Sequence, residues 1–185
     1  LTFVKLGEEA RVNLQQFTME GGQASRFRQT VRRLEKDGGT FRIVPAGQVS
    51  AIMPRLQTVS DDWLEQKAGA EKGFSLGFFD AQYLERFPVA VVELGGEIQA
   101  FANLWPGPQK EELSIDLLRY HSNAPKGVME ALLVHLLIWG KSENYRWFGL
   151  GMAPMSGFEQ SPIAPLWMRL GNLLYEHGEV LYNFQ

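Results

Sequence analysis

The chain has 185 residues, of which 45% are hydrophobic and 21% are charged, the composition of an ordinary folded domain with a sizeable core. Its net charge of −3 argues against broad electrostatic coating of nucleic acid, although residues 1–45 carry a local +3 and the remainder −6. The absence of cysteine excludes disulfides, a catalytic thiol and cysteine-bound metal, and the three histidines have no metal-ligand spacing, so we expect no metal site. No apolar run approaches the ~20 residues that a helix needs to cross a bilayer.

The first third of the chain predicts short strands and two helices. Two strands are expected around a Gly-Glu-Glu turn at 7–9, and apolar residues at helical spacing predict a helix over 23–37. A turn and a strand follow over 38–44. The segment 48–67 predicts a second helix, in which Pro54 marks either a kink or a later start.

The middle of the chain combines a loop, a short helix and a hairpin. Glycines punctuate residues 68–79, which are expected to form a loop, and Asp80 is the predicted cap of the short helix that follows. Within 88–105, two β-rich runs meet at Gly95-Gly96, a strong two-residue turn signal. This region therefore predicts a β-hairpin.

The last part predicts strand, long helix, strand, helix and strand. A strand over 113–120 precedes the longest amphipathic helix, over 125–145, and another strand covers 146–153. A strand that leads through a crossover helix to a parallel neighbour is the usual βαβ arrangement, and the hairpin before it makes the sheet mixed. This layout, α+β with helices on both faces of the sheet, is that of the Gcn5-related N-acetyltransferase fold.

The turn into the long helix argues against the cofactor of that fold. Acetyltransferases use glycine-rich backbone there, whose amides hold the coenzyme A pyrophosphate. Here the turn reads YHSNAPKGV, in which Pro125 lacks an amide hydrogen and Gly127 is the one glycine. We therefore expect neither coenzyme A nor another cofactor.

The strand over 113–120 carries two charges among apolar residues, Asp116 and Arg119. Strand alternation sends residues three apart to opposite faces of a sheet. The two side chains can therefore line one pocket only if a bulge intervenes or Arg119 reaches round the strand end. From spacing alone, a mutual ion pair that closes the strand end is the alternative to a functional role.

Several long segments carry a family resemblance in one order. They are SDDWL (60–64), EKGFSLGFFDAQYLERFPVAVVE (71–93), AFANLWP (100–106), SIDLLRY (114–120), WFGLGMAPMSG (147–157) and PLWMRLGNLLYEHGEVLYNFQ (165–185), preceded by 7–33. Together they resemble the catalytic domain of the aminoacyl-phosphatidylglycerol synthases, the multiple peptide resistance factor family. A series of long matches in one order is far more specific than a short motif.

The resemblance implies an aminoacyltransferase. Such a domain takes lysine or alanine from aminoacyl-tRNA and esterifies it to a glycerol hydroxyl of phosphatidylglycerol, at the cytoplasmic face of the bacterial inner membrane, which changes membrane charge and resistance to cationic antimicrobial peptides. The chain would be one acetyltransferase-like domain over 1–185, with a basic entry segment over 1–45 and the main sheet over 46–185. It would form the second half of a tandem pair, after a first half and a membrane domain upstream of Leu1.

The family motif implies roles for individual residues. Asp116 would orient the acceptor hydroxyl or hold the α-ammonium of the amino acid, and Arg119 would grip a phosphate of lipid or tRNA. Glu71 matches a position implicated in activity and would recognise an amino group, or else is a solvated loop carboxylate. Ser156 and Gly157 would let substrate approach or offer an oxyanion site, or else belong to a structural loop.

The basic helix suits phosphate, either of a tRNA acceptor stem or of anionic lipid headgroups, with Arg26, Arg32 and Arg33 as the expected contacts. A merely solvated charged face is the alternative. Of the tryptophans, Trp105 is the candidate for membrane-interface contact and the others are expected in the core.

The family pattern continues past YNFQ with a functional lysine, so we expect an excised fragment that is inactive alone. A peptide or protein aminoacyltransferase of the same fold and a non-catalytic tRNA- or lipid-binding module are the competing functions.

Overall fold

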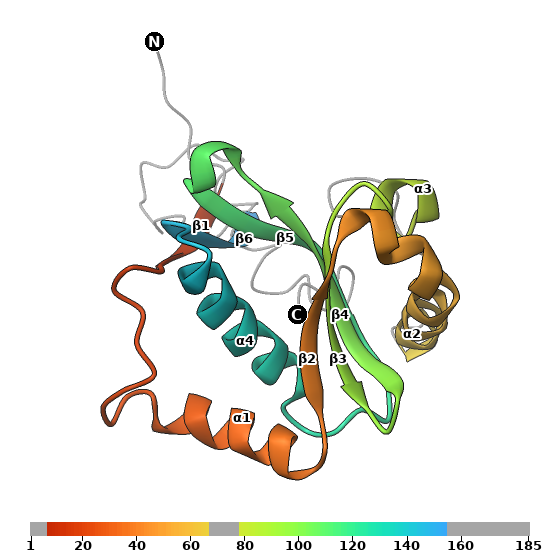
Figure 1. Cartoon of the computed structure of the whole chain (residues 1–185), viewed down its shortest axis with the longest axis horizontal. Helices are drawn as coiled ribbons and strands as arrows, with labels where there is room; N and C mark the ends of the chain where they lie inside the picture. The colour runs from red at the N-terminus through yellow and green to blue at the C-terminus, as the bar shows by residue number, and fades with distance from the viewer. Residues whose placement is uncertain (1–6, 67–77, 155–185) are drawn as a thin grey trace, which may run out of the picture. The chain divides into compact units, whose positions relative to one another are not determined.

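The computed structural model describes residues 7–66 and 78–154 (Figure 1). The chain forms two compact units, of which the larger is Val12–Gly149 and the other consists of Leu1–Arg11 and Leu150–Gln185. The larger unit contains all the described helices. No helix in the described ranges is long and apolar enough to cross a membrane.

A mixed sheet with the strand order β1-β6-β5-β4-β3-β2 organises the fold. The strands are β1 (Gly7–Asn13), β2 (Thr40–Val44), β3 (Val89–Leu94), β4 (Glu97–Pro106), β5 (Glu112–Tyr120) and β6 (Trp147–Pro154). Neighbours from β2 to β5 are antiparallel, whereas β5 and β6 are parallel. The helix between β5 and β6 supplies the crossover that parallel strands require, so the expected mixed sheet is confirmed.

Helices cover both faces of the sheet (Figure 1). They are α1 (Ser25–Lys36), α2 (Met53–Gln66), α3 (Ala81–Leu84) and α4 (Val128–Ser142), with 3₁₀ turns η1 (Ala46–Ile52) and η2 (Pro108–Lys110). One face packs against α1 and α4, and the other packs against η1, α2 and α3. The two faces thus hold separate cores, an α4 side and an α2 side.

Strand β3 shows how the sequence supplies both cores. Its fully buried residues alternate between the faces: Ala90 and Val92 belong to the α4-side core, while Val89 and Val91 belong to the α2-side core. Burying each valine side chain stabilises the fold by roughly 1.5–3 kcal/mol. A strand between two covered faces must be apolar throughout, which explains the run VAVV.

Two turn signals act as predicted. Gly95 and Gly96 have φ angles of 59° and 85°, the left-handed region that a two-residue hairpin turn favours and that glycine enters without strain. Pro54 marks a later helix start, because η1 ends at Ile52 and α2 begins at Met53. Proline is tolerated there because the first helical turn leaves its amides without intrahelical partners.

One expectation is wrong. The Gly-Glu-Glu stretch at 7–9 is part of the single strand β1 and does not form a turn. Residues 8–11 are exposed, so their charges remain in water within the strand, and one glycine without a second turn residue does not reverse the chain.

Candidate functional site

A bulge in β5 brings the two charged residues to one face of the sheet. Ala102 of β4 lies opposite Leu118, but Leu104 lies opposite Ile115, so Asp116 and Leu117 together oppose Asn103. The side chain of Asn103 is fully buried, and its Oδ1 accepts a hydrogen bond of 2.7 Å from the amide of Leu117. Because a bulge adds one residue to the strand, the side-chain alternation is reset at this point.

The consequence appears in the packing on either side of the bulge. Ile115 and Leu118 contact the α4-side core, whereas Leu117 belongs to the α2-side core. Asp116 contacts Tyr83 of α3, and Arg119 contacts Trp63 of α2, so both charged residues face the α2 side. The bulge in β5 therefore places Asp116 and Arg119 on the same face of the sheet, as a shared pocket would require.

Asp116 is held by an aromatic hydroxyl. The Tyr83 hydroxyl donates to Asp116 Oδ2 at 2.7 Å and accepts a hydrogen bond from Trp105 Nε1 at 2.8 Å. Tyr83 is placed in turn by Asp80, whose carboxylate accepts from the Tyr83 amide at 2.8 Å and caps α3 as predicted. Among the residues that the structure describes, Tyr83 is the one hydrogen-bond partner of the Asp116 carboxylate, which leaves Oδ1 available.

Tyr83 is fixed as a proton donor. Burial, and then the hydrogen bond to Asp116, raise the pKa of Tyr83 to about 12. A phenol next to a carboxylate resists ionisation because two negative charges would face each other. At neutral pH the Tyr83 proton therefore stays on the oxygen that faces Asp116.

Arg119 lies against an aromatic ring. Its side chain is 5% exposed, and its guanidinium carbon lies 3.8 Å from the centroid of the Trp63 ring. Stacking on indole favours the planar cation and fixes its orientation. In the part of the chain that the structure describes, no ion pair joins Asp116 to Arg119; each is held by a different aromatic side chain.

The turn after β5 is fastened to α2 by Asp62. Asp62 Oδ2 accepts from the Ser122 amide at 2.5 Å and contacts His121 Nδ1 at 2.8 Å, while Oδ1 accepts from the Ser122 hydroxyl at 3.0 Å. The Ser122 amide is the largest cause of the lowered pKa of Asp62. Neighbouring residues of α2, Asp62 and Trp63, thus brace the end of β5 where Arg119 lies.

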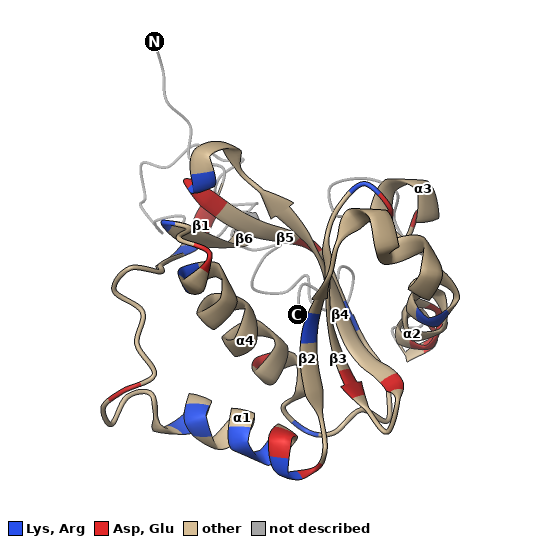
Figure 2. Cartoon of the chain, in the orientation of Figure 1, with Lys and Arg blue, Asp and Glu red and all other residues tan. Residues whose placement is uncertain are grey.

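Helix α1, which packs on the α4 side of the sheet, carries mostly Lys and Arg among its charged residues, coloured blue in Figure 2. A hollow of about 770 Å³ lies between α1 and the turn that enters α4. Arg26 and Arg33 line it, but Arg32 does not, and Arg28 instead donates to the carbonyls of Met19 and Gly21 at 2.6 and 2.9 Å. The structure therefore brings together two of the three arginines that the sequence predicted for phosphate.

Three expected site residues, Glu71, Ser156 and Gly157, lie outside the described residues. Sequence reasoning missed Tyr83, Trp63 and Lys126, of which Lys126 lines the hollow. The Asp80 cap was a usable signal for Tyr83, because a capped one-turn helix fixes the direction of its third residue. Trp63 was assigned to the core, and nothing in its spacing indicates the contact with Arg119.

No group of three metal-ligating side chains occurs within 7–66 and 78–154. At the entry to α4, Gly127 adopts a φ of 87° as the N-cap, and Pro125 precedes it.

The α2-side face of the sheet offers a carboxylate with an available oxygen, a stacked guanidinium and a phenol donor. Such a set can accept a proton and stabilise an anion, which are the requirements of acyl transfer.

Comparison with known proteins gives one consistent result. Residues 1–185 match the family described as "Phosphatidylglycerol lysyltransferase, C-terminal". The phosphatidylglycerol lysyltransferase of Bacillus subtilis is 39% identical over 184 residues, which are 98% of this chain and 21% of that protein.

Two solved structures are also similar. The C-terminal domain of a putative lysylphosphatidylglycerol synthetase from Agrobacterium fabrum is 44% identical with a TM-score of 0.83, and the match covers 98% of this chain and 54% of that one. L-PGS from Bacillus licheniformis is 41% identical with a TM-score of 0.76, over 94% of this chain and 53% of that one. The chain thus spans about a fifth of the curated relative and about half of each solved chain, and it belongs to the family of phosphatidylglycerol lysyltransferase C-terminal domains.

Proposed function

We propose that this chain is an acyl-transfer domain that moves an amino acid, lysine or alanine, from aminoacyl-tRNA to phosphatidylglycerol. The names of the relatives support lysine and the lipid acceptor. The observation that carries the proposal is the β5 bulge, which sets Asp116 and Arg119 on one face with an Asp116 oxygen available. The parent protein then acts at the cytoplasmic face of the bacterial inner membrane, where charged tRNA and the lipid headgroup meet.

The reaction exchanges one oxygen ester for another. A glycerol hydroxyl oxygen of phosphatidylglycerol attacks the carbonyl carbon of the aminoacyl ester and forms a new C–O bond. The bond from that carbon to the ribose oxygen of tRNA breaks, and the proton of the glycerol hydroxyl ends on the ribose oxygen. No oxidant, reductant or net water is consumed.

Asp116 and Arg119 have different roles in this reaction. Asp116 Oδ1 accepts the hydrogen bond of the attacking hydroxyl and removes its proton as the new bond forms. Tyr83, on Oδ2, is a positioning residue that orients the carboxylate and does not touch substrate. The Arg119 guanidinium stabilises negative charge, either on the tetrahedral oxyanion or on the lipid phosphate.

Glu71, Ser156 and Gly157 complete the proposed site. Glu71 recognises an amino group of the transferred amino acid, and the Ser156-Gly157 backbone admits the ester or donates to its oxyanion. Lysine has a second amino group that an acidic residue can bind, whereas alanine has none, so the Glu71→Gln variant separates the two donors. A lysine-specific loss of rate in this variant would identify lysine as the amino acid.

The test uses the parent protein that contains this chain, phosphatidylglycerol vesicles, and tRNA charged with labelled lysine or alanine. Label is expected in the lipid extract, and Asp116→Asn should lower the rate by about 10²-fold or more. Asp61→Asn is the matched control, since Asp61 is an exposed carboxylate of α2 that accepts a hydrogen bond from Gln57. Label in protein instead of lipid, or a fully active Asp116→Asn variant, would overturn the proposal.

A further inference from the structure

We infer that the hollow between α1 and the turn 121–127 binds the phosphodiester backbone of single-stranded RNA. The inference rests on the proposed function in one respect, because the RNA is the arm of tRNA that carries the amino acid. The hollow itself is separate from Asp116 and its hydrogen-bond partner Tyr83. Tyr120 packs on the α4 side, where the hollow lies, and Leu117 packs on the α2 side with Asp116.

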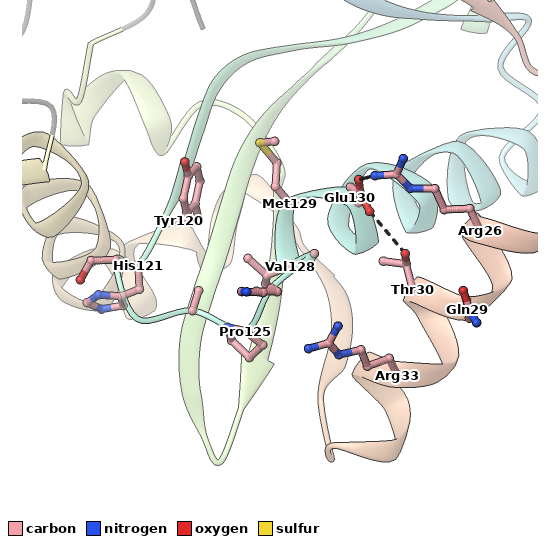
Figure 3. A pocket seen from close by; sticks show the side chains of 14 residues that line it. Arg26, Gln29, Thr30, Arg33, Tyr120, His121, Pro125, Val128, Met129 and Glu130 are labelled. Atoms are coloured by element: carbon pink, nitrogen blue, oxygen red, sulfur yellow. Dashed lines mark hydrogen bonds and ion pairs between the residues drawn. The ribbon is translucent and has the colours of Figure 1, made fainter.

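The hollow collects cations from two elements (Figure 3). Arg26, Gln29, Thr30 and Arg33 follow one face of α1 at helical spacing, and Lys126 comes from the opposing turn. In Figure 3 the Arg33 side chain extends from α1 toward the turn that carries Pro125. Cations that face each other across a hollow can contact a phosphate that enters it.

Two of these cations have no acidic partner among the described residues. Within residues 7–66 and 78–154, neither Arg33 nor Lys126 has a side-chain hydrogen bond or ion pair. Arg26, by contrast, pairs with Glu130 of α4, which also accepts from the Thr30 hydroxyl at 3.4 Å. The lining therefore has an excess of positive charge that the described residues do not neutralise.

The shape of the lining favours RNA over a lipid surface. A bilayer is nearly flat and meets protruding cations, whereas these cations line a concavity of about 770 Å³. Tyr120, Pro125 and Met129, the last 39% exposed, add flat or apolar surface beside the charges. A positive groove with apolar and aromatic surface is the usual combination for single-stranded nucleic acid, whose bases stack while the backbone is neutralised.

The end of β5 connects the two sites. Arg119 faces the α2 side, and the next residue, Tyr120, contacts the α4-side core and lines the hollow. An RNA strand held in the hollow therefore lies beside the strand end that carries Arg119. The hollow would retain the RNA arm while the ester at its end is transferred.

The experiment measures binding without transfer. A labelled single-stranded RNA of about 12 nucleotides is titrated with the parent protein that contains this chain at several salt concentrations, and affinity is read from fluorescence anisotropy. Arg33→Ala and Lys126→Ala should each weaken RNA binding about three- to ten-fold. Each should also reduce the slope of the logarithm of affinity against the logarithm of salt concentration by about one, because one fewer cation contacts a phosphate. Arg32→Ala is the matched control, because Arg32 lies on the same helix outside the hollow, and its affinity should stay near that of the unaltered protein.

Glu130→Gln gives a change of opposite sign. It removes the negative charge of the lining and releases Arg26, so RNA should bind more tightly. Equal losses in Arg32→Ala and Arg33→Ala, or unchanged affinity in Glu130→Gln, contradict the inference. Dependence of phosphatidylglycerol-vesicle binding, but not RNA binding, on Arg33 would assign the hollow to lipid and also overturn it.

The two proposals fail separately. Asp116→Asn should bind RNA normally while losing transfer, because Asp116 is outside the hollow. Arg33-dependent RNA binding without any lipid product would refute the proposed reaction and leave the hollow assigned. Lipid product without Arg33-dependent RNA binding would support the proposed reaction and refute the assignment of the hollow to RNA.

Discussion

The guanidinium of Arg119 and the indole of Trp63 stack at 3.8 Å between carbon and ring centroid, and this contact joins β5 to α2. Arg119 is 5% exposed, so the attraction acts where water screens it little. Asp62, next to Trp63, holds the turn two and three residues beyond Arg119. Helix α2 thus fixes both the direction of the cation and the path of the chain behind it.

Trp63→Ala should therefore misplace Arg119 without removing its charge. A desolvated cation–π contact contributes about 2 kcal/mol, so we expect a loss of roughly ten-fold or more in the rate of lipid aminoacylation. Trp63→Phe keeps an aromatic face and should recover most of the rate. The comparison of kcat in the two variants, with thermal melting as a check on folding, makes the measurement; equal activity of Trp63→Ala and the unaltered protein would show that Arg119 needs no such support.

Tyr83→Phe tests the orientation of Asp116. The variant keeps the ring but loses the hydrogen bond to Asp116 Oδ2, so the carboxylate gains rotational freedom. The rate should fall about ten-fold through kcat, with little change in KM, since Tyr83 does not touch substrate. Tyr145→Phe serves as a control on a tyrosine that packs in the α4-side core, outside the hollow, and a rise in KM alone would assign Tyr83 to binding instead.

The pKa of Tyr83 gives an alkaline signature. With a folded pKa of about 12 against ~10 in the unfolded chain, the stabilising contribution is fully present below pH ~10 and is lost as pH rises toward 12. The difference in unfolding free energy between the unaltered protein and Tyr83→Phe should be constant from pH 7 to ~10 and shrink above it. Urea unfolding measures this, and tyrosinate absorbance should show one late-titrating group that the variant lacks; a difference that grows with pH has the wrong sign.

The Asn103→Ala variant tests whether the β5 bulge depends on its hydrogen bond to the Asn103 side chain. In Asn103→Ala the buried amide of Leu117 loses its acceptor, which costs about 1–3 kcal/mol, and Asp116, next to Leu117, should lose its position. Both the melting temperature and the transfer rate should fall. Gln99→Ala on the same strand is the control, because the described contacts of Gln99 use its backbone carbonyl, and an Asn103→Ala variant with full activity would separate the bulge from function.

The sequence predicted the sheet well because its signals are local. Gly95-Gly96 forms a tight turn, the VAVV run consists largely of β-branched residues that favour a strand, and Asp80 caps α3 by accepting a hydrogen bond from the amide three residues later. These interactions join residues that are close in the chain, so spacing and residue type are sufficient. The error at 7–9 has the same origin, since a glycine with two carboxylates has a turn composition that an exposed strand can also accommodate.

The site was only half predictable because its contacts are distant in the chain. The pair Asp116 and Arg119 was identified, and the condition for their shared face, a bulge, was stated, but the residue that supports the bulge lies 14 positions from Leu117. Tyr83 reaches Asp116 across 33 positions, and Asp62 reaches Ser122 across 60. No periodicity encodes such pairs; they depend on which helix the sheet places over which strand.

Asp62 supplies an acidic counterpart to the test of Tyr83. The Ser122 amide, and then the side chains of His121 and Ser122, hold the pKa of Asp62 below its ordinary value. A carboxyl whose folded pKa is depressed stabilises the protein above its unfolded pKa of ~3.9, and this contribution is lost as pH falls through the folded value. Asp62→Asn should therefore be less stable than the unaltered protein at pH 6, by about 1 kcal/mol for the weakened hydrogen bonds, and the difference should shrink as pH falls below ~3.9 and through the folded pKa of Asp62. Urea unfolding at pH 6 and at a series of lower pH values checks this, with Asp61→Asn as the exposed neighbour that should show a smaller difference. If the difference in unfolding free energy between the unaltered protein and Asp62→Asn stays the same at low pH, the Asn side chain disturbs the turn for reasons unrelated to the charge of Asp62.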